Sequence, residues 1–335
     1  MSGFPMPPCW HNITMSLQWM LFSKRVILQT FNSYLIEMAV IKEYINVRDD
    51  RLLDGLTPVV RLMTRVEALS ESDAVTIDFG DTVFITPVCA LSMIVYLAGC
   101  GRKVSMRNIP DYLETIGVTN GGIKPDQMRR TEFLAIMEKY SAKSYIPIVS
   151  FAASENIDDK EAISSVVENI LIRQLNIRPN VAMGLKYMVE ETLDNITEHS
   201  KSKRGYIMAQ AYPRKGYLDI CMADNGVTLL GSYKKLADNE IVDDLEAIKA
   251  ANRGISSKNL PEAENRGYGI QTSKRMLVEG LGGQYLMISG SCLYLKSPGH
   301  DNVYSVPDGL RWNGTIVALR IPVDSSQFNY VNYLE

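Results

Sequence analysis

The stretch "VAMGLKYMVEETLDNITEHS", residues 181–200, predicts a long helix with two chemically different sides. At about 100° per residue, one side carries the apolar residues Leu185, Val189, Leu193 and Ile196. Glu191, Asn195 and His199 follow one another at every fourth residue on roughly the opposite side. We expect the apolar side to pack on a sheet. The polar stripe is then either part of a site or an ordinary solvated helix face.

The composition is that of a folded protein large enough for two domains. Of 335 residues, 46% are apolar and 22% are charged, and the net charge of -3 gives no overall attraction to nucleic acid. The five cysteines are scattered and never spaced as CxxC, which argues against a disulfide framework and against a zinc site. We therefore expect a cytoplasmic protein without a nucleic-acid partner.

Residues 1–38 form an extension with no clear fold signal. The apolar run of residues 13–22 comes before the basic pair Lys24 and Arg25, which is the wrong order for a secretory signal. The run is also too short to span a bilayer, so no stable membrane insertion is expected, while a membrane-surface role stays open. The sequence also leaves open whether the native chain starts at Met1 or at Met38.

Residues 39–148 alternate between strand and helix patterns. "DAVTIDFGDTVFI", residues 73–85, predicts two short strands around a Gly-Asp turn. "TPVCALSMIVYLAGCG", residues 86–101, predicts a helix capped by Thr86 and started by Pro87. A strand at 102–109 and a short helix at 110–117 follow. We expect a small α/β domain with helices on one side of its sheet.

A second unit is expected over residues 149–325, with a tail at 326–335. Its predicted order is a helix at 158–175, the helix at 181–200 capped by Asn180, and paired strands within 205–224. A long polar segment, residues 230–266, then separates these strands from a helix at 269–282. Strands within 282–296 and 314–323 complete the unit. This order predicts an α/β sandwich.

Three stretches downstream of the long helix carry signals for a nucleotide. In "ADNGV", residues 223–227, Asp224 follows a strand and could accept a hydrogen bond from an exocyclic amine, while Gly226 would let a flat base approach the backbone. An ordinary Asn-Gly turn explains this stretch equally well. In "NRGYGIQTSKRML", residues 265–277, glycines precede a helix, where free backbone amides favour phosphate oxygens. "NGTIVALRIP" places Gly314 and Thr315 at the head of the last strand.

In this order, the helix and the three stretches resemble the N, G1, G2 and T boxes of the histidine-kinase-like ATPase superfamily. That superfamily includes gyrase, heat-shock ATPase chaperones, sensor histidine kinases and mismatch-repair ATPases. The resemblance covers about residues 155–323 and implies a Bergerat-type α/β sandwich ATPase domain that binds ATP and Mg²⁺. Residues 247–270 also look like the lid of bacterial members.

The resemblance assigns roles to individual residues. Asn195 would ligate Mg²⁺ through its amide oxygen, and Glu191 would orient and deprotonate the attacking water, with Glu190 as the second choice. Asp224 would read the adenine amine with Gly226 beside it. The other nucleotide contacts would be Gly267, Tyr268, Gly269 and Thr315. His199 would support the site edge or serve in capping or packing, and Lys258 would either pair with the terminal phosphate or remain a solvated loop lysine.

Four features bear on the kind of ATPase. The family's G1 box usually has a second glycine where this chain has Thr228, which puts turnover in more doubt than binding. No histidine lies between His11 and His199, which argues against histidine autophosphorylation, and little sequence follows the last strand to form a transducer domain. Residues 75–106 resemble the STAS-like fold of anti-sigma-factor antagonists. In that family a serine or threonine near the position of Thr86 can be phosphorylated, but the helix cap explains Thr86 as well.

The sequence therefore predicts a Mg²⁺-dependent ATP-binding protein, a slow ATPase that acts as a nucleotide-driven regulatory switch on a protein partner or within a homodimer. A STAS-like domain would precede the ATPase domain. Two alternatives remain open, namely an anti-sigma-type protein Ser/Thr kinase and a non-hydrolysing ATP-gated interaction module.

Overall fold

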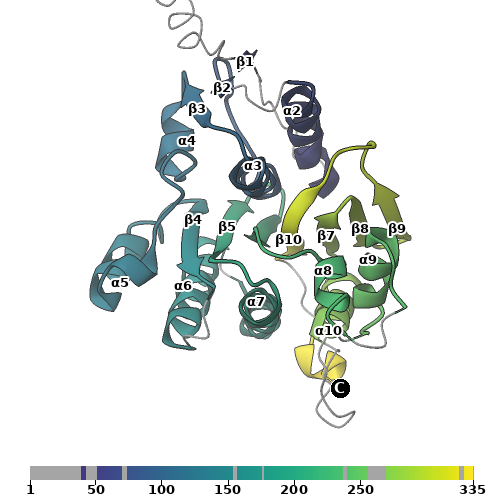
Figure 1. The fold of residues 1–335 in the computed structure, drawn as a ribbon. Coiled ribbons are helices and arrows are strands. Elements are labelled where there is room, and N and C mark those ends of the chain that lie inside the picture. The colour runs from purple at the N-terminus through teal and green to yellow at the C-terminus, as the bar shows by residue number, and fades with distance from the viewer. Residues whose placement is uncertain are drawn as a thin grey trace, which may run out of the picture.

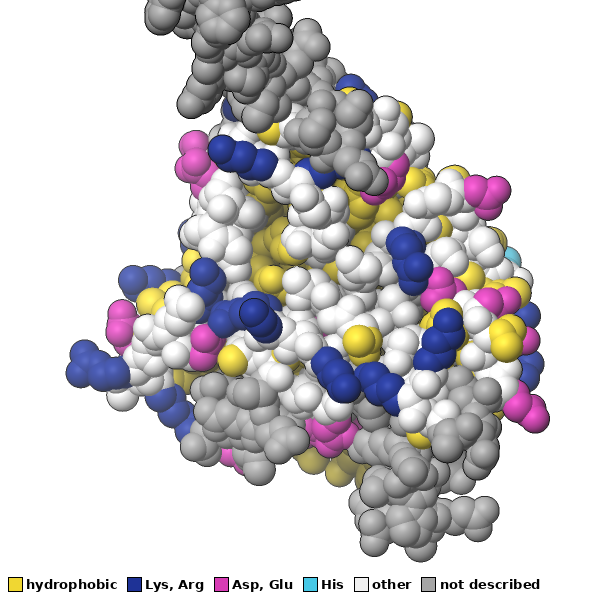
Figure 2. Space-filling view, in the orientation of Figure 1, with side chains coloured by type: hydrophobic (Ala, Val, Ile, Leu, Met, Phe, Trp, Pro, Cys, Tyr) yellow, Lys and Arg dark blue, Asp and Glu magenta, His cyan; other side chains and the backbone are white. Residues whose placement is uncertain are grey.

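The computed structural model describes residues 39–42, 51–69, 74–153, 157–175, 177–236, 240–255, 269–323 and 328–334. The N-terminal extension expected at residues 1–38 lies outside this part of the chain. Within the part that is described, no helix combines the length and apolar character needed to cross a bilayer. Lys and Arg side chains are spread over the described surface of the face shown in Figure 2.

The centre of the molecule is a seven-stranded antiparallel sheet in the order β4-β5-β6-β10-β7-β8-β9. Its strands are β4 (Tyr145–Ala152), β5 (Arg204–Tyr212), β6 (Tyr217–Asp224), β7 (Gln284–Gly290), β8 (Cys292–Ser297), β9 (His300–Ser305) and β10 (Trp312–Pro322). The expected pairing within residues 205–224 is confirmed, because β5 and β6 form a hairpin. The strand β9 was not anticipated, since its side chains are mostly exposed and show no apolar alternation.

One face of the sheet is covered by α6 (Ile157–Leu175), α7 (Pro179–His199) and α10 (Gly269–Arg275), which continues as the π-helical turn η3 (Met276–Gly280). The apolar side predicted for α7 is confirmed, because Leu185, Val189, Leu193 and Ile196 are all buried in this core. The expected cap by Asn180 is wrong. The helix begins at Pro179, and the Asn180 amide instead donates to the Phe328 carbonyl oxygen near the C-terminus.

The N-terminal unit contains a parallel three-stranded sheet in the order β1-β2-β3. Its elements are β1 (Ala39–Lys42), η1 (Leu52–Leu56), α2 (Thr57–Glu67), β2 (Val75–Asp78), α3 (Pro87–Gly99), β3 (Val104–Arg107), α4 (Asp111–Thr115), η2 (Pro125–Gln127) and α5 (Arg130–Glu138). The Thr86 cap is confirmed, because its hydroxyl accepts from the Cys89 backbone N–H at 3.4 Å. The second strand expected before it is wrong. The Thr82 amide donates to the Phe79 carbonyl, which makes a turn, and only Phe84 forms an isolated bridge.

The helix α3 packs on β5, β6 and β10, on the face opposite to α6 and α7 (Figure 1). The side chain of Trp312, which is fully buried, donates from its indole N–H to the Ser92 carbonyl oxygen of α3 at 3.1 Å. One apolar core therefore runs through both units. The boundary expected between residues 148 and 149 falls inside β4, a strand of the large sheet.

The segment expected to be polar between residues 230 and 266 contains α9 (Asp244–Asn252), and α8 (Leu229–Tyr233) overlaps its start. Asp243 caps α9 by accepting from the Glu246 backbone N–H. Near the C-terminus a short 3-10 helix, η4 (Tyr330–Tyr333), packs against α7 and η3. These short elements lie on the same side of the sheet as α6, α7 and α10, which we call its lower face.

Replacing Trp312 with Phe tests the shared core. The change removes the hydrogen bond to Ser92 and leaves unfilled space, so we expect the free energy of unfolding to fall by about 1–3 kcal/mol. Urea denaturation followed by far-UV circular dichroism measures the loss, with Tyr304→Phe on the exposed side of β9 as the neutral control. Two separate transitions, with only one of them shifted, would show that the two units do not share a core.

Candidate functional site

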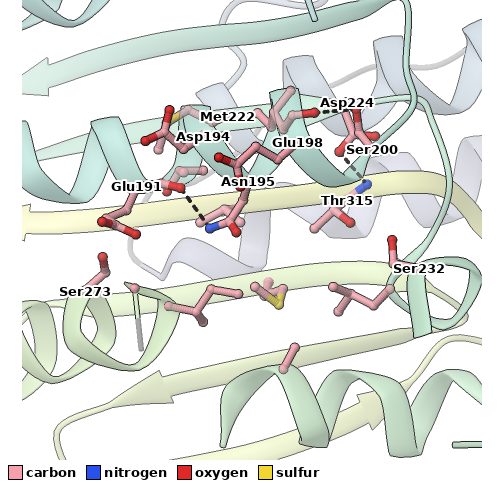
Figure 3. A pocket seen from close by; sticks show the side chains of 18 of the residues that line it. Glu191, Asp194, Asn195, Glu198, Ser200, Met222, Asp224, Ser232, Ser273 and Thr315 are labelled. Carbon is pink, nitrogen blue, oxygen red and sulfur yellow. Dashed lines mark hydrogen bonds between the residues drawn. The ribbon is translucent and has the colours of Figure 1, made fainter. Parts of the chain in front are cut away.

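A cavity of about 1060 Å³ lies between the lower face of the sheet and the helices α7, α8, α9 and α10. Five of the residues predicted for a nucleotide site line it, although they come from four separate segments: Glu191, Asn195, Asp224, Gly269 and Thr315. Several of them are drawn in Figure 3. The volume is at the upper end of the range for small-molecule sites. The fold therefore brings five of the ten expected site residues together around one cavity.

Asp224, at the end of β6, is fixed by two backbone amides from different loops. The Gly226 N–H donates to Asp224 Oδ1 at 2.8 Å, and the Thr315 N–H donates to Oδ2 at 3.2 Å. The residue is 2% exposed, and burial raises the pKa of its carboxyl to about 7 even though the two amides favour the ionised form. Gly314 has a φ of +76°, and a Cβ there would lie 2.2 Å from the Asp224 carbonyl oxygen. A glycine is thus required where β10 passes Asp224.

Asn195 and Glu191 lie one turn apart on the cavity side of α7. The Asn195 amide nitrogen donates to the Glu191 carbonyl oxygen at 2.8 Å, as the dashed line in Figure 3 shows. This bond orients the side-chain amide, so that its oxygen is the atom left to coordinate a ligand. A neutral oxygen in that position suits a hard divalent cation.

Gly269, the first residue of α10, lies directly against the Glu191 carboxylate. A Cβ at Gly269 would fall 1.9 Å from Glu191 Oε2. Glycine is therefore the residue that lets α10 approach α7 with Glu191 in this position. Gly269 lines the cavity, and its proximity to the carboxylate was not anticipated.

Gly226 is required for a different reason than the one expected. It is not among the residues that line the cavity, and a Cβ there would lie 1.9 Å from the Ser200 carbonyl oxygen at the end of α7. The next residue reinforces this contact, since the Val227 N–H donates to the same oxygen at 2.7 Å. Gly226 thus allows the loop after β6 to pack on the end of α7 and brings Asp224 next to the cavity.

Thr228, which stands where the resembled family has glycine, caps α8. Its hydroxyl accepts from the Gly231 N–H at 3.2 Å, and Thr228 does not line the cavity. Beside it, the buried Ser289 hydroxyl accepts from the Leu229 N–H and donates to the Gly314 carbonyl oxygen, both at 2.9 Å. Ser289 joins the loop after β6 to the start of β10. No local sequence signal marked this role.

The sequence also missed part of the cavity wall. Asp194 and Glu198 line the cavity from α7, three and seven residues after Glu191, a spacing that the helical period could have revealed. Ser273 of α10 is 4% exposed, and its hydroxyl has no hydrogen-bond partner within the described chain. In Figure 3 it lies across the cavity from Glu191. A buried hydroxyl of this kind is available to a ligand.

Some expected site residues are not placed with the cavity. Gly267, Tyr268 and Lys258 lie outside the described residues, as does the side chain of His199. Glu190 is described, and it faces α6 instead of the cavity. Its carboxylate accepts from the Ser164 hydroxyl at 3.2 Å and lies 3.9 Å from the Lys186 ammonium. Glu191 is therefore the carboxylate of the pair that reaches the site.

The described cavity lining is acidic, with four carboxylates and neither Lys nor Arg: Glu191, Asp194, Glu198 and Asp224. Tyr187 also lines it, and burial together with Glu191 raises the pKa of its hydroxyl. Lys274 of α10 does not line the cavity. Its ammonium donates to the Asn252 carbonyl oxygen at 2.5 Å and lies over the Tyr294 ring. Among the described residues, no group of three or more His, Cys, Asp or Glu side chains is arranged to hold a metal ion.

Comparison with models of protein families gives no match for this chain, and a search of curated proteins finds none that is similar.

The raised pKa of Asp224 predicts how stability depends on pH. Because the folded-state value, about 7, lies above the unfolded value of 3.8, the folded protein holds an extra proton between these pH values. This contribution to stability is complete below pH 4 and is lost as the pH rises through 7, at about 1.4 kcal/mol per pH unit in between. Urea denaturation of the wild type and Asp224→Asn from pH 5 to pH 8 measures it. The difference between the two proteins should change up to pH 7 and then level off, and a constant difference would contradict the assignment.

Proposed function

We propose that this protein binds ATP with Mg²⁺ in the cavity and hydrolyses it slowly, in a Bergerat-type ATPase domain that follows a STAS-like domain. The observation that carries the proposal is the convergence of Glu191, Asn195, Asp224 and Thr315 on one cavity from three separate segments. The sequence resemblance gives each of these positions a role at a nucleotide site, with Glu191 as the base and the other three as contacts of the nucleotide or its Mg²⁺.

The Asp224 end of the cavity suits an adenine ring. An ionised carboxylate, held still by two amides, accepts a hydrogen bond from the exocyclic amine of the base. Met222, Met287 and Val317 provide apolar contact in the same cavity. Such a site favours an amino group over a carbonyl at that position of the base, because two facing acceptors repel each other.

The middle of the cavity suits a magnesium-phosphate complex. The carboxylates that line it would repel a bare triphosphate, so an anionic ligand needs a cation to accompany it. Asn195 supplies one neutral oxygen ligand, and Mg²⁺ commonly takes few protein ligands while retaining phosphate oxygens and waters. Glu191, one turn away, would take a proton from a water that attacks the terminal phosphate.

Ligand binding in the cavity would change the N-terminal unit through β10. Residues 312 and 313 at the start of β10 form hydrogen bonds to α3. The next residue, Gly314, accepts a hydrogen bond from Ser289, and Thr315 donates one to Asp224. A ligand that shifts the start of β10 would therefore change how α3 sits, and with it the surface offered to a protein partner or to a second copy of the chain. Thr86 is 3% exposed and caps α3, so no phosphorylation is needed to explain it.

Replacing Glu191 with Gln tests the chemistry. The amide cannot accept the proton of water, so we expect the hydrolysis rate to fall about 10²- to 10⁴-fold while Mg-ATP still binds. Release of phosphate from γ-labelled ATP measures turnover, and equilibrium dialysis measures binding.

Glu190→Gln is the matched control, because Glu190 sits next to Glu191 but faces α6. It should retain turnover close to that of the wild type. Equal activity of wild type and Glu191→Gln would remove Glu191 as the base. Label that appears on protein would indicate a Ser/Thr kinase, and binding without release or transfer would indicate a non-hydrolysing module.

The affinity for nucleotide should depend on pH. Below pH 7 the buried Asp224 is protonated, and the proton must leave before the carboxylate accepts from the base. We expect Mg-ADP to bind about tenfold more weakly at pH 6 than at pH 8. Displacement of a fluorescent ADP analogue measures this, and Asp224→Asn should show a much smaller dependence. An affinity that is the same at both pH values would count against Asp224 as the base-reading group.

A further inference from the structure

After β10 the chain returns to the cavity. Residues 328–334 pack under the helical layer against α7 and η3, and Leu334 is one of the residues that line the cavity. In Figure 1 this C-terminal segment is the yellow turn below α10. None of the four sequence boxes includes it. It nevertheless contributes part of the wall.

Glycines in α7 and η3 provide the space in which the C-terminal segment packs. A Cβ at Gly184 of α7 would lie 2.8 Å from the Phe328 ring, and a Cβ at Gly280, the end of η3, would lie 2.8 Å from the same ring and 2.9 Å from Tyr333. The two aromatic rings stack at 5.9 Å, and the Asn180 amide donates to the Phe328 carbonyl oxygen. Phe328 is 5% exposed. Two glycines thus leave room for this segment, which makes its position specific.

The contacts along α7 show which end of the cavity the segment reaches. Asn180, Gly184, Tyr187 and Glu191 are spaced by three or four residues and form one stripe on the helix. The segment contacts the first two, while the last two line the cavity. Asp224 lies near the opposite end of α7, where the loop after β6 packs on Ser200. Leu334 therefore enters from the Glu191 side.

We propose that the C-terminal segment closes the phosphate end of the nucleotide site, with Leu334 as the side chain next to the terminal phosphate. This inference rests on the proposed function. An apolar side chain there limits the entry of bulk water and of a protein hydroxyl toward Glu191. In turn, a bound nucleotide shields the Leu334 side chain from solvent. Leu334 is 41% exposed, which leaves its side chain accessible to a reagent.

Cysteine labelling tests this arrangement in the full-length chain. Leu334→Cys is treated with a maleimide with and without Mg²⁺ and a non-hydrolysable ATP analogue, and mass spectrometry follows the adduct at position 334. The matched control is Val331→Cys, which lies in the same segment, is 54% exposed and does not line the cavity. We expect the Mg²⁺-bound ATP analogue to slow labelling at position 334 at least about fivefold and to leave the labelling rate at position 331 unchanged.

The remaining outcomes each decide against the proposal. Unchanged labelling at position 334, with binding of the Mg²⁺-bound ATP analogue verified by dialysis of the same variant, would place the C-terminal segment outside the ligand site and leave the proposed function intact. Equal slowing at both positions would mean general stabilisation by the ligand and would also overturn it. If neither the wild type nor the variant binds a nucleotide, the proposed function fails and this inference fails with it.

Discussion

The architecture of the candidate site depends on the carboxylate of Asp224, which two backbone amides hold at the end of β6. One amide belongs to Gly226 and the other to Thr315, so the bonds join the loop after β6 to the start of β10. The same loop packs on the end of α7 at Ser200, and Ser289 connects it to Gly314. The loop after β6, the start of β10 and the end of α7 therefore meet near one buried acid. These hydrogen bonds hold that end of the cavity in place. Burial of this acid has a cost, and its raised pKa expresses that cost.

The central strands of the large sheet are buried on both faces, and the two faces have different neighbours. The face toward α6 and α7 borders the cavity, whereas the opposite face packs on α3 and the N-terminal unit. The start of β10 touches both. Trp312 bonds to α3, while Thr315, three residues later, bonds to Asp224. In the proposed function, a change at the ligand would reach the N-terminal unit across one strand, through contacts that are already formed and close-packed.

The sequence predicted the parts of the fold that follow from local patterns. The helical period placed Glu191 and Asn195 opposite the buried side of α7, and the Thr86-Pro87 pair marked the start of α3. Long-range contacts could not be read in this way. Asn180 looked like a cap, but its partner Phe328 comes much later in the chain, and the same holds for Gly226 with Ser200 and for Leu334 with the cavity. Asp243 before α9 is a local capping signal, although the polar residues around it favour a loop.

The most direct test of a magnesium-nucleotide site is calorimetric titration of the folded protein with ATP, first with Mg²⁺ and then with a chelator in its place. The account predicts a heat of association with one nucleotide per chain when Mg²⁺ is present and clearly weaker binding when it is removed, because the acidic lining repels a bare triphosphate. The absence of any heat of association with well-folded protein under either condition would contradict it.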